Sequence, residues 1–368
     1  MKLKAFVAAL AVVAIPASAE TFKYSAWTPP PAPNNRLGTV PMFEKITAET
    51  AGTENEMTFE NFMGGQVFNA FTTLAGLRDG VVDGGILVPG YNSAELKTHT
   101  TMGELQALAK EGYAAAGAGT ETLLLNCPEC LEEYGAQNVM PMGVYATAPY
   151  HLMCNFDLTS MDQLQGKRSA EGNPMFNRWA ASLGMSRQGL PPNEFQQALA
   201  RGTVDCVFAP KDWLVAFSLA DVVKTVVDDV SHGVFPAVVM MGVNKGTWDG
   251  MTPGRKEIFA REIPQAIMNV VDGYYLDEVK GKDLALSNGA KFISLGDGFA
   301  QAWADFQASE RTEVIAAAEA RGATGAAAAV DANIALLAEW EAIVEDVGKD
   351  PVLLAARLHE RVFATLVD

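Results

Sequence analysis

The sequence is poor in the residues that most catalytic and metal sites require. It has only four histidines, at positions 99, 151, 232 and 359, and none of them forms an H-x-x-x-H or H-E-x-x-H pair. The G-x-S-x-G nucleophile motif and the G-x-x-x-x-G-K-[ST] phosphate loop are also missing. Because no nucleophile–base set and no metal-ligand cluster can be recognised, we predict a binding protein that uses no cofactor and no metal, rather than an enzyme.

Cysteine is also scarce, and four residues are far too few for a disulfide-stapled scaffold. Cys127 and Cys130 form the sequence C-P-E-C, for which we predict a local disulfide. A catalytic dithiol is the alternative, but such pairs lie at a helix start, whereas this pair is expected late in one helix over residues 111–137. Cys154 and Cys206 lie in apolar, strand-like runs and are expected to be buried rather than reactive.

No apolar run beyond the N-terminus is long enough to cross a membrane. At the N-terminus itself, two lysines precede an apolar stretch over residues 5–15, and "ASA" over residues 17–19 matches a cleavage site. We therefore predict a signal peptide over residues 1–19, cleaved after Ala19, and export of the mature protein to the periplasm. An N-terminal anchor helix is the alternative.

Positive charge is in short supply as well. The chain has 27 Lys and Arg against 44 Asp and Glu, so its formal net charge is −17, and loss of the two signal-peptide lysines makes it −19. A surface this acidic disfavours nucleic acid and anionic membranes. We expect no nucleic-acid partner, no direct membrane insertion and a monomeric protein.

Strand-like and helix-like segments alternate through most of the mature chain. The first set has strands expected over 21–27, 56–63 and 81–91, separated by helices over 37–52 and 69–80. This rhythm implies a parallel sheet wrapped by helices. A second set follows from residue 138, including a short strand over 167–172 and a helix over 212–230, and the last third reads as almost wholly helical from Pro253 onward.

The predicted fold class is therefore α/β, with two lobes and a helical C-terminal tail. We assign residues 20–147 plus 236–275 to the first lobe, and 148–235 plus 276–368 to the second lobe and the tail, with crossing strands between them. Ligands of open α/β sheets bind beyond the carboxyl ends of the strands. Two facing lobes would create one cleft that closes by a hinge motion.

The chain resembles the periplasmic solute-binding subunits of tripartite ATP-independent periplasmic (TRAP) transporters, the C4-dicarboxylate-type receptor family. The segments that carry the resemblance are "PMFEKITAETAG", "FMGGQVF", "LAGLRDGVVDGGILVPGY", "MDQLQGKR", "EFQQALARGTVDCVFAP" and "GVNKGTWDGMTP". The paired "LRDGVVD" and "LARGTVD" are the most specific of them. The resemblance implies two α/β lobes, crossing strands, a long helix that braces both lobes, and a small organic acid as the usual ligand.

The resemblance also implies a ligand-anchoring Arg on the strand after the Gly of "LQG", and here the sequence departs from it. The matching position is Ala170. Arg168 lies two residues earlier, on the same face of a strand, so that Arg168 or the later Arg178 could replace the anchor. Polar side chains common in the family are also replaced, by Phe208 and Ala209.

The polar and aromatic residues that remain near the expected cleft favour a positively charged or zwitterionic amine. Glu171 and Asp212 supply the acids, although a solvated rim or a helix N-cap is an equally simple role for them. Trp27 and Tyr91 supply rings, unless they belong to the lobe core. The full set of candidate ligand-binding positions is Trp27, Glu60, Tyr91, position 149 in the Pro149–Tyr150 pair, Arg168, Ala170, Glu171, Ala209, Asp212, Trp213 and Phe235.

The predicted function is that of an extracytoplasmic receptor. It would capture a small organic solute between its lobes and deliver it to TRAP membrane subunits, driven by an ion gradient as the resemblance implies. One alternative is a sensory receptor that presents its ligand-bound form to a membrane kinase. The other is a periplasmic dithiol enzyme that uses Cys127 and Cys130.

Overall fold

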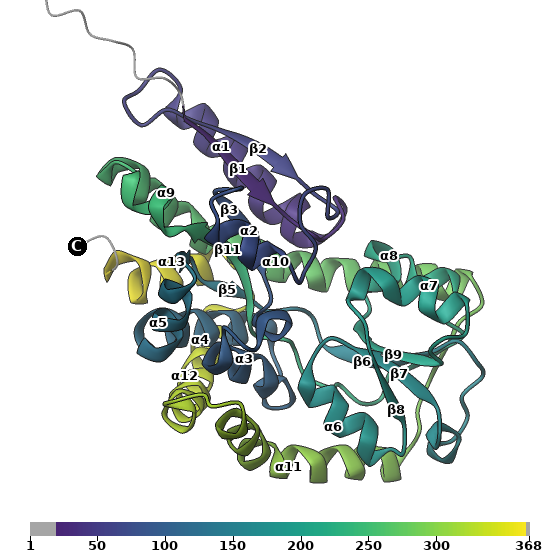
Figure 1. The fold of residues 1–368 in the computed structure, drawn as a ribbon. Coiled ribbons are helices and arrows are strands. Elements are labelled where there is room, and N and C mark those ends of the chain that lie inside the picture. Colours follow the sequence, from purple (N-terminus) through teal and green to yellow (C-terminus); the bar gives the residue numbers. More distant parts are fainter. Residues whose placement is uncertain (1–19, 366–368) are drawn as a thin grey trace, which may run out of the picture.

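The computed structural model describes residues 20–365, so the predicted signal peptide over 1–19 lies outside the described residues. Two separate six-stranded sheets dominate the architecture, and helices surround each of them (Figure 1). None of the helices in the described part of the chain is both long and apolar enough to cross a membrane. The predicted α/β fold with two lobes is confirmed.

The first sheet has the strand order β2-β1-β3-β11-β4, and β5 pairs with β11 beside β4. Strands β1, β2 and β3 run parallel, while β11 is antiparallel to its neighbours. The strands are β1 (Glu20–Ser25), β2 (Met57–Phe62), β3 (Gly84–Leu87), β4 (Val139–Pro141), β5 (Val144–Tyr145) and β11 (Val238–Asn244). Its associated helices are α1 (Val40–Thr50), α2 (Thr73–Arg78), α3 (Lys97–Glu104), α4 (Gly112–Leu125), α5 (Pro128–Ala136) and α9 (Lys245–Gly250).

The second sheet has the order β12-β10-β6-β9-β7-β8. Its strands are β6 (Tyr150–Cys154), β7 (Arg168–Glu171), β8 (Ser186–Gly189), β9 (Cys206–Pro210), β10 (Thr225–Val227) and β12 (Lys291–Ile293). Three short helices, α6 (Pro174–Ser182), α7 (Phe195–Ala200) and α8 (Trp213–Ala216), follow β7, β8 and β9 along the chain. The strand–helix alternation therefore places a helix start just beyond the carboxyl end of each of these three strands.

Two antiparallel segments carry the chain between the sheets. One runs from β5 to β6 and the other from β10 to β11. The Thr147 N–H donates to the Phe235 carbonyl at 3.1 Å, and the Tyr150 N–H donates to the Gly233 carbonyl at 2.9 Å. Pro149 and Val234 form a bridge between these two bonds. These are the crossing strands that the sequence predicted.

The long helix α10 (Pro253–Ser287) braces both halves of the molecule, as the resemblance implied. With 35 residues it is about 52 Å long at 1.5 Å per residue. The Asp277 side chain pairs with Arg36, which follows β1, while Lys282 donates to Asp228, which follows β10, at 2.7 Å. One helix thus makes ion pairs with the segments that follow strands of both sheets.

The helical tail packs mainly on the first half of the chain. It consists of α11 (Asp297–Ala320), α12 (Ala326–Val347) and α13 (Pro351–Arg361). Trp340 of α12 and Arg361 of α13 both bind Glu121 of α4, the indole N–H at 2.9 Å and the guanidinium at 2.8 Å. The lobe boundaries stay a prediction, but these contacts lead us to propose that α12 and α13 belong with the first lobe rather than the second.

Two helices expected from the sequence are broken in the structure. The expected helix over 111–137 ends at Leu125, and α5 begins at Pro128. Proline lacks an N–H group and disfavours helical conformation in the residue before it, which explains the break. The C-P-E-C pair therefore lies at a helix start, so the placement expected from the sequence was wrong.

The expected helix over 212–230 is also wrong. It stops after α8, and the chain re-enters the second sheet as β10. Ser218 adopts a left-handed conformation at φ 55°, which ends the helix, and the β-branched run Thr225–Val227 fits a strand. Strand β12 was also missed, because it is only three residues long within the helical last third.

Both cysteine pairs form disulfides. Cys127 is bonded to Cys130, as predicted, and Cys154 is bonded to Cys206 across the neighbouring strands β6 and β9. The burial expected for the second pair is confirmed, but its bond was not foreseen. The sequence separations of the two bridges are 3 and 52 residues, so they constrain the unfolded chain very differently.

This difference gives a prediction about stability. Replacing Cys154 and Cys206 with Ala should lower the free energy of unfolding by about 4 kcal/mol, because the closed loop is long. The matched variant without Cys127 and Cys130 should lose only about 2 kcal/mol, because its loop is short. Urea unfolding followed by circular dichroism measures both. Equal losses for the two variants would contradict the loop-length argument.

Candidate functional site

A cavity lies where the carboxyl ends of strands from both sheets meet. Trp27 follows β1, Tyr91 follows β3, Asn173 follows β7 and Asp212 follows β9. The crossing segments contribute Tyr145, Thr147, Tyr150 and Phe235, and the bracing helix contributes Tyr274. This is where open α/β sheets place their ligands. The cavity has about 650 Å³ of empty volume, part of it open to solvent.

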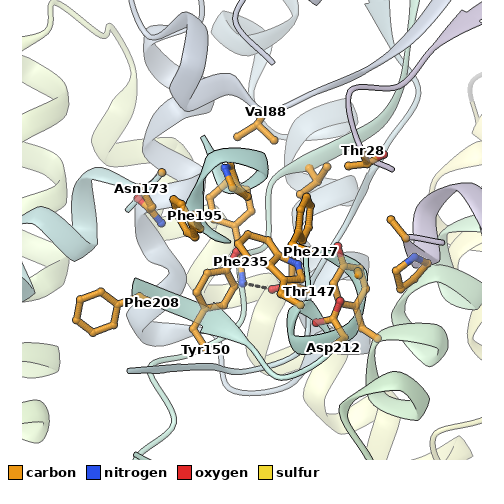
Figure 2. A pocket seen from close by; sticks show the side chains of 18 of the residues that line it. Thr28, Val88, Thr147, Tyr150, Asn173, Phe195, Phe208, Asp212, Phe217 and Phe235 are labelled. Atoms are coloured by element: carbon orange, nitrogen blue, oxygen red, sulfur yellow. Dashed lines mark hydrogen bonds between the residues drawn. The ribbon is translucent and has the colours of Figure 1, made fainter. Parts of the chain in front are cut away.

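Aromatic rings form most of the cavity wall (Figure 2). Phe176 stacks on Phe208 with ring centres 4.5 Å apart, and Tyr150 packs between Phe176 and Trp213 at 5.4 and 5.6 Å. Trp213 in turn contacts Phe217 at 4.9 Å. The rings in the wall are Trp27, Tyr91, Tyr145, Tyr150, Phe176, Phe195, Phe208, Trp213, Phe217, Phe235 and Tyr274.

The lobes approach each other in the wall of this cavity at Tyr91 and Gly172. Tyr91 belongs to the turn after β3, and Gly172 directly follows β7 of the second sheet. A Cβ atom on Gly172 would lie 2.5 Å from the Tyr91 hydroxyl oxygen, which is closer than atoms can approach. A side chain at position 172 would therefore require the Tyr91 ring to shift.

Asp212 is the one charged side chain among the described residues that line the cavity. It is 1% exposed, and neither carboxyl oxygen accepts a hydrogen bond of normal geometry. Burial raises the pKa of Asp212 well above its usual value, and Glu278 and Asp277 of α10 raise it further. The backbone N–H groups of Asp212 and Trp213 oppose this rise only partly. The carboxyl is thus held in its neutral form far above the ordinary range.

Three tyrosines lie in the electrostatic field of Asp212. Burial raises the pKa values of Tyr145, Tyr150 and Tyr274, and the proximity of the Asp212 carboxyl, where it is ionised, adds to the rise in each case. The Tyr145 and Tyr274 hydroxyls hydrogen-bond each other, and the Tyr150 hydroxyl bonds the Thr147 side chain. The phenols are therefore engaged with one another and with Thr147 rather than with the acid.

The predicted site residues divide into two groups. The structure brings five of them together around the cavity: Trp27, Tyr91, Asp212, Trp213 and Phe235. At position 149, Pro149 bridges the crossing segments, and its neighbour Tyr150 faces the cavity. Asp212 precedes α8 but makes no capping hydrogen bond with its side chain, and it is buried, so the alternative roles of rim charge and N-cap do not describe it.

Of the other candidates, those whose side chains the structure describes lie outside the cavity wall. Glu60 is exposed on β2, while Ala170 and Ala209 are buried within the second sheet. Glu171 ends β7, and its side chain is not among those that the structure describes. Arg168 forms a two-pronged ion pair with Asp205 at 2.9 and 3.0 Å. That pairing removes Arg168 as a ready substitute for the missing anchor.

Arg178 is occupied as well. It binds Glu310 of α11 with two N–H groups at 2.7 and 3.0 Å, and Glu104 of α3 at 2.6 Å. Both glutamates are fully buried. Withdrawing Arg178 would leave Glu310 buried without its partner, although Glu104 would keep its ion pair with Arg321. Of the two replacement anchors considered from the sequence, neither reaches the cavity wall in the described structure.

Several lining residues were missed in the sequence analysis. They are Tyr145, Thr147, Asn173, Phe176, Phe195, Phe217 and Tyr274. Three of these rings stand within a few residues after predicted strands, in "NPMF", "NEF" and "DWLVAF". Aromatic residues at strand ends were thus a usable signal. Tyr274 had no such signal, because only the path of α10 brings it to the cavity.

The half-buried acid Glu278, close to Asp212, provides a test of these electrostatics. Burial raises its pKa to about 7, against the opposing charge of Lys211, whose ammonium lies 3.9 Å away. The folded protein therefore holds a proton that the unfolded chain loses near pH 4.5. The contribution of this bound proton to the free energy of unfolding is fully present below pH 4.5. It is lost as the pH rises toward 7, and the total loss is about 3 kcal/mol at most.

We expect Glu278→Gln to remove this dependence. The free energy of unfolding of the variant, relative to the wild type, should be higher at pH 8 than at pH 5, measured by urea unfolding. Glu341→Gln, on the exposed part of α12, is the matched control and should follow the wild type at both values. If the free energy of unfolding changes equally with pH in the wild type and in Glu278→Gln, this carboxyl is not desolvated.

Solved structures of other proteins share this fold. A marine metagenome TRAP solute-binding protein described as specific for aromatic acids, in complex with metahydroxyphenylacetate, is 22% identical, with a TM-score of 0.76 over 88% of this chain and 99% of its own. A TRAP solute-binding protein from Rhodoferax ferrireducens with copurified benzoate is 17% identical, with a TM-score of 0.76 over 88% and 99%. One from Bordetella bronchiseptica with bound mandelate is 18% identical, with a TM-score of 0.71 over 87% and 99%.

Sequence comparison gives the family directly. A search of curated proteins found no significant match. The profile of bacterial extracellular solute-binding proteins of family 7 matches residues 30–316, which is most of the chain. The resemblance predicted from the sequence is thus confirmed, and the chain belongs to family 7 of the bacterial extracellular solute-binding proteins.

Proposed function

We propose that this protein is the periplasmic receptor of a TRAP transporter and that its solute carries a positive charge. The family and the shared fold support a receptor that captures a small solute and passes it to membrane subunits. The observation that carries the charge of the solute is Asp212. It is the one acidic or basic side chain in the described cavity wall, it is buried, and its oxygens have no side-chain partner.

The surrounding rings favour the same class of ligand. An ammonium group moved from water into an apolar cavity loses its hydration, and the loss is recovered only through a counter-ion and the faces of aromatic rings. Asp212 provides the counter-ion, and Tyr150 and Trp213 stand nearby in the wall. A carboxylate in this cavity would meet Asp212 without a cationic side chain among the described lining residues.

Aromatic acids are the competing class, because the similar structures were described with such ligands. A neutral Asp212 could donate a hydrogen bond to one carboxylate oxygen, and the rings could pack on its aromatic part. The two classes differ in the charge required of Asp212, so one experiment separates them.

The experiment is a thermal-shift screen of matched pairs that share a carbon skeleton and differ in charge, such as benzylamine with benzoate and phenethylamine with phenylacetate. A ligand that binds only the folded state raises the melting temperature. We expect amines to raise it and the matched acids to leave it unchanged.

Asp212→Asn should weaken amine binding by roughly 2–5 kcal/mol, as for loss of one half of a buried charge pair.

A matched variant guards against a general loss of folding. Asp205→Asn removes an acid of the same sheet that pairs with Arg168 outside the cavity, and it should leave amine affinity unchanged. Tight binding of benzoate or phenylacetate with no response to the amines would overturn the proposed charge of the solute, while the assignment as a receptor would remain.

Lobe closure gives a separate prediction. Gly172→Ala would drive a methyl group into the Tyr91 hydroxyl and should weaken ligand binding by about 1–3 kcal/mol, the usual range for overpacking. Removing that hydroxyl with Tyr91→Phe in the same chain should restore most of the affinity. Calorimetric titration with the best amine of the screen measures both variants. If the second substitution restores nothing, the contact between Gly172 and Tyr91 does not limit closure.

A further inference from the structure

A second unpaired group belongs to a residue that lines the same cavity from the opposite lobe. The indole N–H of Trp27 is buried, lines the cavity and has no hydrogen-bond partner. Trp27 follows β1 of the first sheet, whereas Asp212 follows β9 of the second. The cavity therefore offers one free donor from one lobe and one free acid from the other.

Most of the remaining polar side chains of the wall are engaged by the protein. The half-buried Tyr91 is the exception, because its hydroxyl has no hydrogen-bond partner among the described residues. The Thr28 hydroxyl accepts hydrogen bonds from the amides of Asn34 and Asn35 at 2.8 and 3.1 Å. The Thr147 hydroxyl accepts from the Phe235 N–H at 3.0 Å, the bond drawn in Figure 2, and donates to the Ala148 carbonyl.

Asn173 is also engaged. Its amide group donates to the Gly103 carbonyl and to the Gln106 side chain, each at 2.9 Å. Its side-chain oxygen accepts from the Met175 N–H at 3.1 Å. Among the buried lining side chains that the structure describes, only Trp27 and Asp212 therefore have polar atoms without a partner.

An unpaired buried polar group costs folding free energy, and a ligand that pairs with it recovers that cost. An indole N–H can only donate, so the ligand atom opposite Trp27 must be an acceptor. A residue that only supplies an apolar ring to the wall needs no N–H group. Several phenylalanines fill that role in this cavity, so the unpaired N–H of Trp27 calls for a separate explanation.

We infer that the solute is bifunctional, with a cationic centre bound by Asp212 at one end and a hydrogen-bond acceptor, such as a carbonyl or carboxylate oxygen, bound by the Trp27 indole at the other. This inference rests on the proposed cationic ligand and adds the second group and its partner. A solute of this kind bridges the two lobes, because its two ends bind residues that follow strands of different sheets.

The test uses two series of probes of increasing length. One series is the linear alkylammonium ions, and the other is the ω-amino amides, which carry the same ammonium group and add a carbonyl acceptor. Dissociation constants are measured by calorimetry for the wild type, Trp27→Phe and Asp212→Asn. Varying the chain length allows for the spacing between the two protein groups.

We expect at least one ω-amino amide to bind about tenfold or more tightly than the alkylammonium ion of equal length. Trp27→Phe should abolish this advantage and leave the affinity for the alkylammonium series within about threefold. Asp212→Asn should weaken both series. If Trp27→Phe fails to fold, replacement of Trp27 by benzothienylalanine keeps two fused rings and removes only the N–H group.

Other outcomes overturn the inference. If the wild type binds the two series equally well, the protein does not recognise the carbonyl acceptor. Equal weakening of both series by Trp27→Phe would make Trp27 a wall residue only. If neither series binds, or if Asp212→Asn changes nothing, the proposed cationic ligand itself fails, and this failure is distinct from the loss of the Trp27 effect alone.

Discussion

The two crossing segments are the constraint on which the site depends. Their hydrogen bonds fix Thr147 opposite Phe235 and Tyr150 opposite Gly233, between the two sheets. The same short stretch also places Tyr145, Tyr150 and Phe235 in the cavity wall. The connection between the lobes and part of the cavity wall are therefore made from the same backbone. A rotation of one lobe about these segments would change the shape of the cavity directly, without a relay through the rest of the fold.

The bracing helix α10 has a comparable double role. Its residues 274–278 contribute a ring to the cavity, an ion pair to Arg36 and an acid behind Asp212. Each sheet contributes strand ends to the wall, but the electrostatic environment of Asp212 comes largely from this helix. The charge state of the site is thus set by an element that makes ion pairs on both sides of the molecule.

The sequence predicted much of the fold and part of the site. The strand–helix rhythm followed from periodicity, which is a local property of the chain, whereas the crossing strands were implied by the resemblance to the family. The break before Pro128 could have been expected from proline chemistry, whereas the bond between Cys154 and Cys206 depends on the pairing of β6 with β9, which no local pattern reveals. In the site, the absence of Arg at Ala170 was informative, because it directed attention to the acids that remained.

The pairing of the arginines could not be predicted in the same way. Arg168 stood near the expected anchor in the sequence, but its partner Asp205 comes from the start of a strand 37 residues later. Arg178 is bound by residues from α3 and α11, which are distant from it in both directions. Only the folded structure shows which charged side chains are paired with one another. Here both arginines are paired outside the cavity, so the acid Asp212 is left in the described cavity wall without a basic neighbour.

The elevated pKa of Asp212 has a consequence for the energetics of capture. A carboxyl that holds its proton in the empty cavity must release it before it can serve as a counter-ion. Uptake of a cation at this site would therefore be an exchange of one positive charge for another, with the net charge of the cavity unchanged. In an acidified medium, protons would compete directly with the solute, and the receptor would retain its cargo less tightly there than in a neutral one.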